Sequence, residues 1–198
     1  MILLFTLFVN FSYYKWQADS RFYPLTSLIL CFILLFMLKA VFPGSFDPLT
    51  LGHLNIIERA SAIFQEVAVV VAENRVKKTL FSVDERLEMI RETVKPMANV
   101  RCYVWDSLIV DFMKREDIRI IIRGIRGMDD FSFEFELSIM NRALYPQIET
   151  FFMGTDPKYI VLRSSSIKEL ASFHGDVSQM VPALVADALK RKFSAPVN

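Results

Sequence analysis

From residue 38 onward, short runs of β-branched and other apolar residues alternate with longer segments whose apolar residues recur at spacings of three and four. The short runs predict five strands, at Leu38 to Phe42, Val67 to Ala72, Val100 to Trp105, Ile118 to Ile122 and Glu149 to Met153. The longer segments predict helices. Four of them cover an apolar stripe from Leu54 to Phe64, Leu108 to Lys114, Phe131 to Leu144 and Val181 to Phe193. Two more begin at capping boxes, one at Ser82 and Glu85 with a helix through about Val94, and one at Ser166 and Glu169. This alternation predicts an α/β fold with a doubly wound sheet of five parallel strands and additional helices at the C-terminal end.

Residues 1 to 36 differ in composition from the rest of the chain. Two apolar runs, Met1 to Val9 and Leu25 to Leu38, flank a polar stretch from Lys15 to Arg21, and each run is shorter than the roughly 20 residues that a membrane-spanning helix needs. The marks of a signal peptide, a basic region before the first run and a small-residue cleavage site after it, are missing. A membrane-associating segment and translated upstream sequence both stay open; the sequence at Met37 is typical of a protein start, so we expect the second. We therefore expect an apolar extension over residues 1–36, one domain over residues 37–193 and a tail over residues 194–198.

Composition limits the classes of function. The chain carries 23 Lys and Arg against 22 Asp and Glu, a formal net charge of +1, so no overall field attracts nucleic acid or an anionic membrane, and any anion site has to be local. The two cysteines, Cys31 and Cys102, lie far apart without metal-ligand spacing, which indicates neither a disulfide framework nor a zinc site. These features are typical of a protein of the reducing cytoplasm.

Polar residues gather after four of the five predicted strands. The clusters are Pro43 to His53, Glu73 to Lys78, Arg123 to Arg126 and Gly154 to Ser166. Because ligands of doubly wound sheets bind beyond the carboxyl ends of the strands, we expect these clusters to form one site. In the first cluster, Gly44 would let the backbone approach a ligand closely, and His53 falls in the first turn of a helix, where unpaired N–H groups favour an anion.

Several motifs, in a fixed order, resemble those of a known family. They are PGSFDPLTLGH over residues 43–53, Lys77-Lys78 leading to Phe81 and Asp84-Glu85-Arg86, IIIRGIRGMDDFSFE over residues 120–134, Asn141-Arg142, and SSSIKEL over residues 164–170. The first is similar to the motif of the nucleotidylyltransferase superfamily, and residues 37–193 as a whole resemble the bacterial phosphopantetheine adenylyltransferases. A TxGH motif alone is a weak signal, whereas the ordered set is specific. The resemblance implies a Rossmann-like fold for the predicted sheet.

The resemblance also implies a reaction and a set of residue roles. In that family the phosphate of 4′-phosphopantetheine attacks the α-phosphorus of ATP directly, without a covalent intermediate, and gives dephospho-coenzyme A and pyrophosphate. It implies Mg²⁺ as the cofactor, bridging phosphate oxygens without a protein metal site, and a homohexamer as the assembly. His53 is implied as the catalytic residue and as an ATP ligand. The other residues implied at ATP are Ser45, Phe46, Gly124, Ile125, Arg126, Glu134, Tyr159, Ile160, Val161, Leu162, Arg163, Ser164 and Ser165. Those implied at phosphopantetheine are Ser45, Lys77, Ile109 and Arg123.

Each of these residues also has an ordinary structural interpretation. Lys77 can belong to a solvated loop, Arg123 and Arg126 to the surface at a strand end, and Glu134, which lies among phenylalanines, can be a buried structural carboxylate. We favour the functional interpretation because all of them fall at the ligand edge of one sheet. Adenylyl transfer needs charge neutralisation and alignment rather than a protein nucleophile, and this set supplies both. We expect His174, past a predicted helix end, to lie in a surface turn without a catalytic part.

One position departs from the family pattern, in which three serines stand directly before a two-residue apolar step and Lys-Glu. Here Arg163 stands at the first serine position and Ser166 at the first apolar one. Arg163 could add a phosphate contact through its planar fork or could point away.

Two other functions stay open. One is a nucleotidylyltransferase acting on nicotinate mononucleotide or glycerol phosphate, against which the Lys77-Lys78 pair and the residue 121–134 block argue. The other is a catalytically idle nucleotide-binding module tethered to a membrane by residues 1–36, against which the intact His53 and phosphate-binding set argue.

Overall fold

A computed structural model of the chain describes residues 38–73 and 78–194. The chain divides into two compact units, Met1–Met37 and Leu38–Asn198, and the described residues all belong to the second. The predicted extension over residues 1–36 and the candidate ligand Lys77 therefore lie outside the described residues. Within residues 38–73 and 78–194, no helix combines the length and the apolar character that crossing a membrane requires.

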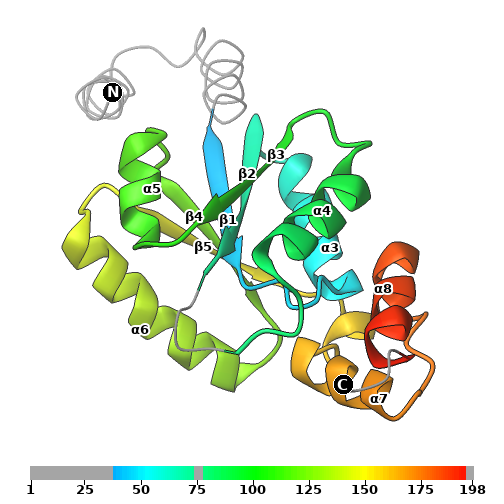
Figure 1. Cartoon of the computed structure of the whole chain (residues 1–198). Helices are drawn as coiled ribbons and strands as arrows, with labels where there is room; N and C mark the ends of the chain where they lie inside the picture. The colour runs from blue at the N-terminus through cyan, green and yellow to red at the C-terminus, as the bar shows by residue number, and fades with distance from the viewer. Residues whose placement is uncertain (1–37, 74–77, 195–198) are drawn as a thin grey trace, which may run out of the picture. The chain divides into compact units, whose positions relative to one another are not determined.

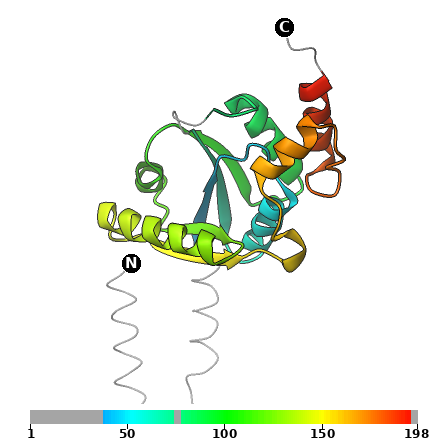
Figure 2. The same cartoon turned by 90° about the horizontal axis from the view of Figure 1, so that it is seen from below.

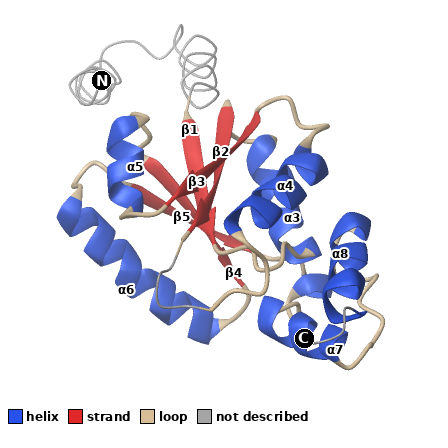
Figure 3. Ribbon diagram, in the orientation of Figure 1, coloured by secondary structure: helices blue, strands red, loops and turns tan. Residues whose placement is uncertain are grey.

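The second unit is built on a five-stranded parallel sheet (Figures 1 and 3). Its strands are β1 (Lys39–Gly44), β2 (Glu66–Ala72), β3 (Val100–Trp105), β4 (Ile120–Ile125) and β5 (Glu149–Gly154). Their order across the sheet is β3-β2-β1-β4-β5, so that Val41 of β1 lies between Ala68 of β2 and Ile121 of β4. The chain returns to the centre between β3 and β4, which makes the boundary between β1 and β4 a topological switch point. The predicted doubly wound α/β fold is confirmed.

Helices cover both faces of this sheet, as Figure 1 and the rotated view in Figure 2 show. One face carries α3 (Leu51–Ser61) and α4 (Val83–Val94), and the other carries α5 (Ile109–Arg115) and α6 (Met128–Leu144). After β5 come η1 (Pro157–Tyr159), α7 (Ser164–Ser172) and α8 (Ala183–Ser194). Apolar residues of α7 and α8 belong to the same core as those of α3 and α4.

The sheet has a separate apolar core on each face, which explains why the sequences of its strands are continuous apolar runs. In β1, Ala40 and Phe42 pack into the core under α3 and α4, whereas Val41 between them packs into the core under α5. In β2 the same alternation places Val69 on the first face and Val70 on the second. Since successive side chains point to opposite faces of a sheet that is covered on both, every position of such a strand favours an apolar residue.

The capping box predicted for α4 is present. The Ser82 hydroxyl accepts the Glu85 N–H at 3.1 Å, and the Glu85 carboxylate accepts the Ser82 N–H at 2.7 Å. The capping box predicted at Ser166 and Glu169 is wrong. Helix α7 begins three residues earlier, with Arg163 as its N-cap in place of Ser166, because the Arg163 carbonyl already accepts the Ile167 N–H at 3.0 Å.

The end of β4 also differs from the prediction, and the difference matters for the site. The strand is Ile120–Ile125 rather than Ile118 to Ile122, so Arg123, Gly124 and Ile125 are its last residues instead of a loop after it. Ile118 lies in the connection before the strand, where it is buried and its N–H donates to the Met113 carbonyl at 2.8 Å. Because a strand holds its side chains in fixed directions, Arg123 is more rigidly placed than a loop residue would be.

Candidate active site

A cavity of about 160 Å³ opens at the carboxyl ends of β1 and β4, at the switch point of the sheet. Its lining is formed by Phe42, Pro43, Gly44, Phe46, Thr50, Gly52, His53, Ile56, Arg123, Gly124, Arg126, Glu134, Thr155 and Leu162. Larger hollows lie between α4 and β3 and between α4 and α8, but neither is lined by a histidine. The cavity at the switch point brings together residues from three of the four predicted polar clusters, as the ligand-edge rule requires.

The turn between β1 and α3 fixes the position and the tautomer of His53. Thr50 is the N-cap of α3, and its hydroxyl accepts the His53 N–H at 3.2 Å. In return, the Thr50 N–H donates to Nδ1 of His53 at 3.1 Å, so the histidine takes the part that Glu or Gln plays in a usual capping box. Because Nδ1 accepts a hydrogen bond, the neutral ring carries its proton on Nε2. His53 therefore lines the cavity with a donor, the Nε2–H, that no described residue engages.

The surroundings keep His53 uncharged at neutral pH. Burial, together with the positive charge of Arg126, lowers the pKa of His53 from 6.5 to about 4. The Phe46 ring packs edge-on against the imidazole, with ring centroids 5.2 Å apart. A neutral imidazole with Nε2–H is a hydrogen-bond donor at pH 7 and a poor proton source, which suits it to stabilise charge on an oxygen.

Phe46 is held in an unusual backbone conformation beneath the site. Its φ is 46°, in the left-handed region that non-glycine residues rarely adopt, and its side chain is almost completely buried. Its ring fills the space that a side chain at position 44 would need, since a Cβ placed on Gly44 would lie 2.9 Å from Cζ of Phe46. The sequence suggested that Gly44 serves close approach of a ligand. The structure adds a second reason for glycine at this position, because a side chain there would collide with the Phe46 ring.

Two arginines reach the cavity from the end of β4, and each is already paired with a carboxylate of α6. Arg123 forms a two-pronged ion pair with Glu134, whose oxygens lie 2.5 Å from Nε and from Nη2. Arg126 pairs with Asp130 at 2.7 Å and donates to the Leu162 carbonyl at 3.2 Å. The ion pairs fix the planes of both guanidinium groups and offset part of the positive charge that a bound phosphate would meet.

The candidate residues divide into those that line the cavity and those that do not. The lining includes Phe46, His53, Arg123, Gly124, Arg126, Glu134 and Leu162. The others lie outside the lining: Ser45, Ile109, Ile125, Tyr159, Ile160, Val161, Arg163, Ser164 and Ser165. Ser45 is next to a lining residue, whereas Ile109 packs against the core under α5. Arg163 is exposed and its side chain makes no capping bond, so the structure places the departure from the family pattern at the surface.

Several cavity residues were missed by sequence reasoning although a signal for them existed. Thr50 and Gly52 belong to the TLGH motif itself, and Ile56 lies one helical turn after Gly52 on the same side of α3. Thr155 directly follows β5, in the fourth polar cluster. His174 lies in an exposed turn with φ of 60°, as predicted for a residue away from the site.

Comparison with known proteins gives consistent results for sequence and fold. The family model described as cytidylyltransferase-like matches residues 41–170. The phosphopantetheine adenylyltransferase of Dictyoglomus turgidum is 48% identical over 157 residues, which cover 79% of this chain and 98% of that protein. The protein of the same name from Syntrophotalea carbinolica is 51% identical over 154 residues, covering 78% of this chain and 93% of that protein. Among solved structures, the nicotinic acid mononucleotide adenylyltransferase of Plasmodium falciparum complexed with NaAD matches with a TM-score of 0.57 and 13% identity, over 78% of this chain and 95% of that one. At that identity it shows a shared fold alone.

Proposed function

The chain belongs to the cytidylyltransferase-like family and, within it, to the phosphopantetheine adenylyltransferases, and from this premise we propose that it transfers the adenylyl group of ATP to 4′-phosphopantetheine. The products are dephospho-coenzyme A and pyrophosphate, a step of coenzyme A biosynthesis. One observation carries the proposal beyond the family name: the switch-point cavity holds a neutral histidine with an available Nε2–H beside two arginines. Such a site can stabilise an in-line transfer between two phosphates and needs no covalent intermediate.

In this proposal His53 is the catalytic residue. Its Nε2–H donates to an oxygen of the α-phosphoryl group as negative charge builds up there during attack. The bond from the Thr50 N–H to Nδ1 holds the ring in the required tautomer, and the low pKa keeps the ring in the same neutral state across the physiological range. The imidazole therefore acts as a hydrogen-bond donor and not as a general acid or base, so no proton has to leave or join the ring during the reaction.

The nucleotide is assigned to the α7 side of the cavity and the acceptor to the other side. We place ATP against three segments and one side chain of α6. The segments are the β1–α3 turn at Ser45 and Phe46, the end of β4 from Gly124 to Arg126, and residues Tyr159 to Ser165; the side chain is Glu134. We place phosphopantetheine at Ser45, Lys77, Ile109 and Arg123. The bond from Arg126 to the Leu162 carbonyl supports this division, because it already joins the end of β4 to the segment before α7.

Mg²⁺ is the proposed cofactor, and the side chains at the site fit a metal ion that arrives with the nucleotide. Among the described residues no group of three or more His, Cys, Asp and Glu side chains could hold a metal. The two carboxylates nearest the cavity arginines, Glu134 and Asp130, are each engaged in an ion pair. Phosphate oxygens and water are the ligands that Mg²⁺ prefers in such sites, where it neutralises phosphate charge.

A homohexamer is the proposed assembly, and α6 offers the apolar surface that it requires. No residue of α6 is fully buried, and Phe133, Ile139 and Met140 are 61%, 57% and 55% exposed. Exposed apolar patches of this kind mark association surfaces. We also place the reaction in the cytoplasm, where ATP is available, and assign it to residues 37–193.

The experiment that tests the proposal is a pyrophosphate-release assay with ATP, Mg²⁺ and three alternative acceptors. We expect the full chain to release pyrophosphate with 4′-phosphopantetheine, and not with nicotinate mononucleotide or glycerol 3-phosphate. A protein beginning at Met37 should retain the activity if residues 1–36 have no part in it. Release with a different acceptor would overturn the assigned substrate, and binding of ATP without any release would favour an idle nucleotide-binding module.

A further inference from the structure

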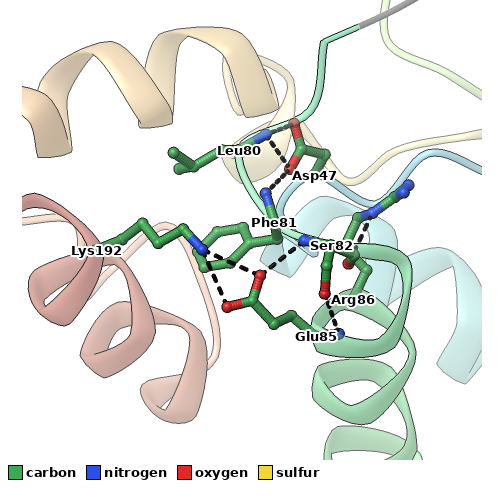
Figure 4. Close-up of polar contacts among 7 residues, drawn as sticks. All are labelled: Asp47, Leu80, Phe81, Ser82, Glu85, Arg86 and Lys192. Carbon is green, nitrogen blue, oxygen red and sulfur yellow. Dashed lines mark hydrogen bonds and ion pairs between the residues drawn. The ribbon is translucent and has the colours of Figure 1, made fainter.

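Asp47 is one of the few charged residues buried among the described residues, with 2% of its surface exposed. It belongs to the β1–α3 turn, between the candidate ligand Ser45 and the N-cap Thr50. Its carboxylate accepts the N–H groups of Leu80 and Phe81 at 3.1 and 3.0 Å, which converge on it from the segment before α4 (Figure 4). It also accepts from Nζ of Lys168 on α7 at 2.5 Å. One side chain therefore joins three segments that are far apart in the sequence.

Helix α7 is attached to the β1–α3 turn at two points, one helical turn apart. The Ser164 hydroxyl donates to the Pro48 carbonyl at 2.9 Å, and Lys168 pairs with Asp47. Residues four apart lie on the same side of a helix, so both contacts act on one face of α7. They hold the first turn of α7, where Ser164 and Ser165 lie, at a fixed distance from the turn that carries His53.

Stability alone is a poor explanation for this lysine. A buried ion pair costs so much desolvation that an apolar pair of similar size often stabilises a fold equally well or better. The Lys168–Asp47 pair differs from an ordinary ion pair in its position, because it joins the two elements to which the nucleotide and the catalytic histidine are assigned.

We propose that Lys168 is a positioning residue for adenylyl transfer: through Asp47 it fixes the N-terminal turn of α7 against the β1–α3 turn, so that nucleotide bound at α7 is aligned with His53. The inference rests on the proposed function for its choice of nucleotide. It assigns Lys168 no contact with ATP. Its effect is on the ATP side of the site and not on the side assigned to phosphopantetheine.

The test compares four variants of the full chain, Lys168→Met, Lys168→Arg, Asp47→Asn with Lys168→Met, and Lys192→Met. Lys168→Met keeps most of the side-chain volume and removes the charge, but it leaves Asp47 buried without its cation. The double variant removes both charges, and the amide oxygen introduced by Asp47→Asn can still accept from Leu80 and Phe81. Lys192→Met is the matched control. Lys192 of α8 pairs with Glu85 of α4 at 3.1 Å, and this ion pair is more exposed than that of Lys168 with Asp47 (Figure 4).

We expect the KM for ATP to rise by about tenfold or more in Lys168→Met, as misplacement of a substrate-holding element does, while the KM for phosphopantetheine changes less than about twofold. Lys168→Arg should recover most of the ATP affinity. The double variant should regain thermal stability but keep the raised KM for ATP, and Lys192→Met should match the wild type. A double variant with wild-type KM and kcat would overturn the inference, as would an equal rise in KM for both substrates.

Equilibrium titration with ATP and Mg²⁺ alone separates this inference from the proposed function. If the wild-type chain binds ATP but does not use phosphopantetheine, the assigned acceptor fails while the effect of Lys168 on ATP affinity can still be measured. Equal ATP affinity in the wild type and the double variant would then refute the positioning role by itself.

Discussion

Two glycines of the β1–α3 region should respond in opposite directions to the same substitution. A Cβ on Gly44 would lie 2.9, 3.1 and 3.2 Å from three carbon atoms of the Phe46 ring, closer than carbon atoms normally approach. The ring has little room to move, because it is buried and packs edge-on against Phe42 and His53 with centroids 5.7 and 5.2 Å away. Gly44→Ala is thus an overpacking substitution, for which about 1–3 kcal/mol of destabilisation is typical.

The corresponding Cβ on Gly52 would meet its nearest neighbour, Oγ1 of Thr50, at 3.5 Å, an ordinary contact. Since Gly52 lies in α3, replacing it with Ala should stabilise the helix by up to about 1 kcal/mol. The new methyl group would nevertheless enter the cavity of about 160 Å³ and reduce activity. Gly52→Ala is therefore the matched control for Gly44→Ala.

Thermal unfolding of the two variants measures the difference. With about 2–4 °C of Tm change for each kcal/mol in a domain of this size, Gly44→Ala should lower Tm by roughly 2–12 °C, and Gly52→Ala should leave Tm unchanged or raise it slightly. Both variants should be less active than the wild type, for different reasons. A Gly44→Ala protein as stable as the wild type, or equal destabilisation in both variants, would refute the steric reasoning.

Further predictions concern the charged and titratable groups. The imidazole of His53 should titrate near pH 4 in an NMR titration, because burial and Arg126 favour its neutral form, and a midpoint near 6.5 would contradict this. Burial opposes ionisation of Asp47, but the bonds from Lys168 and from two backbone N–H groups outweigh it and lower its pKa below 3.8. As pH falls, the Asp47 carboxylate is therefore protonated in the unfolded chain before it is protonated in the folded chain. The contribution of ionised Asp47 to the free energy of unfolding should be complete above about pH 4 and be lost as pH falls through its lower folded pKa. Acid denaturation of the wild type and of Asp47→Asn tests this. Arg86→Met should lower the free energy of unfolding by about 1.5–3 kcal/mol, because the buried Arg86 donates to the Ser45 carbonyl at 2.7 Å and Met offers no donor to replace it. Urea denaturation of the two proteins measures the difference. Burial raises the pKa of the Cys102 thiol to about 11, so its alkylation at pH 8, followed by mass spectrometry, should be far slower than that of free cysteine.

The features that could be predicted well from the sequence are those with local causes. The sheet followed from apolar runs that are buried on both faces, and the start of α4 followed from a capping box contained within four residues. His53 could be placed in the first turn of a helix because the TLGH motif is itself the helix start. That its own ring completes the cap was not predicted, because a histidine is not the usual residue at that position.

The features that sequence reasoning missed depend on contacts between distant residues. The pair of Lys168 with Asp47 joins residues 121 positions apart, and the bond of Arg86 to Ser45 joins residues 41 apart. The start of α7 was misplaced because the Arg163 carbonyl already accepts the Ile167 N–H, so Ser166 lies inside the helix and does not cap it. The bond from the Ser164 hydroxyl to the distant Pro48 carbonyl, which holds this first turn, had no local signal either. Glu134 was assigned to the nucleotide, and no local pattern indicated that its carboxylate would be held by Arg123.

His53→Asn tests most directly whether the Nε2–H of His53 stabilises the transition state of adenylyl transfer. The Asn side-chain oxygen can replace Nδ1 as the acceptor for the Thr50 N–H, so the cap of α3 is kept while the Nε2–H is lost. The same substitution at the other histidine, His174→Asn, is the control, because Asn tolerates the left-handed backbone found there. The measurement is kcat for pyrophosphate release with ATP, Mg²⁺ and 4′-phosphopantetheine. We expect a loss of about 10²- to 10³-fold in His53→Asn with little change in KM, and no loss in His174→Asn. A folded His53→Asn protein with wild-type kcat would contradict the account.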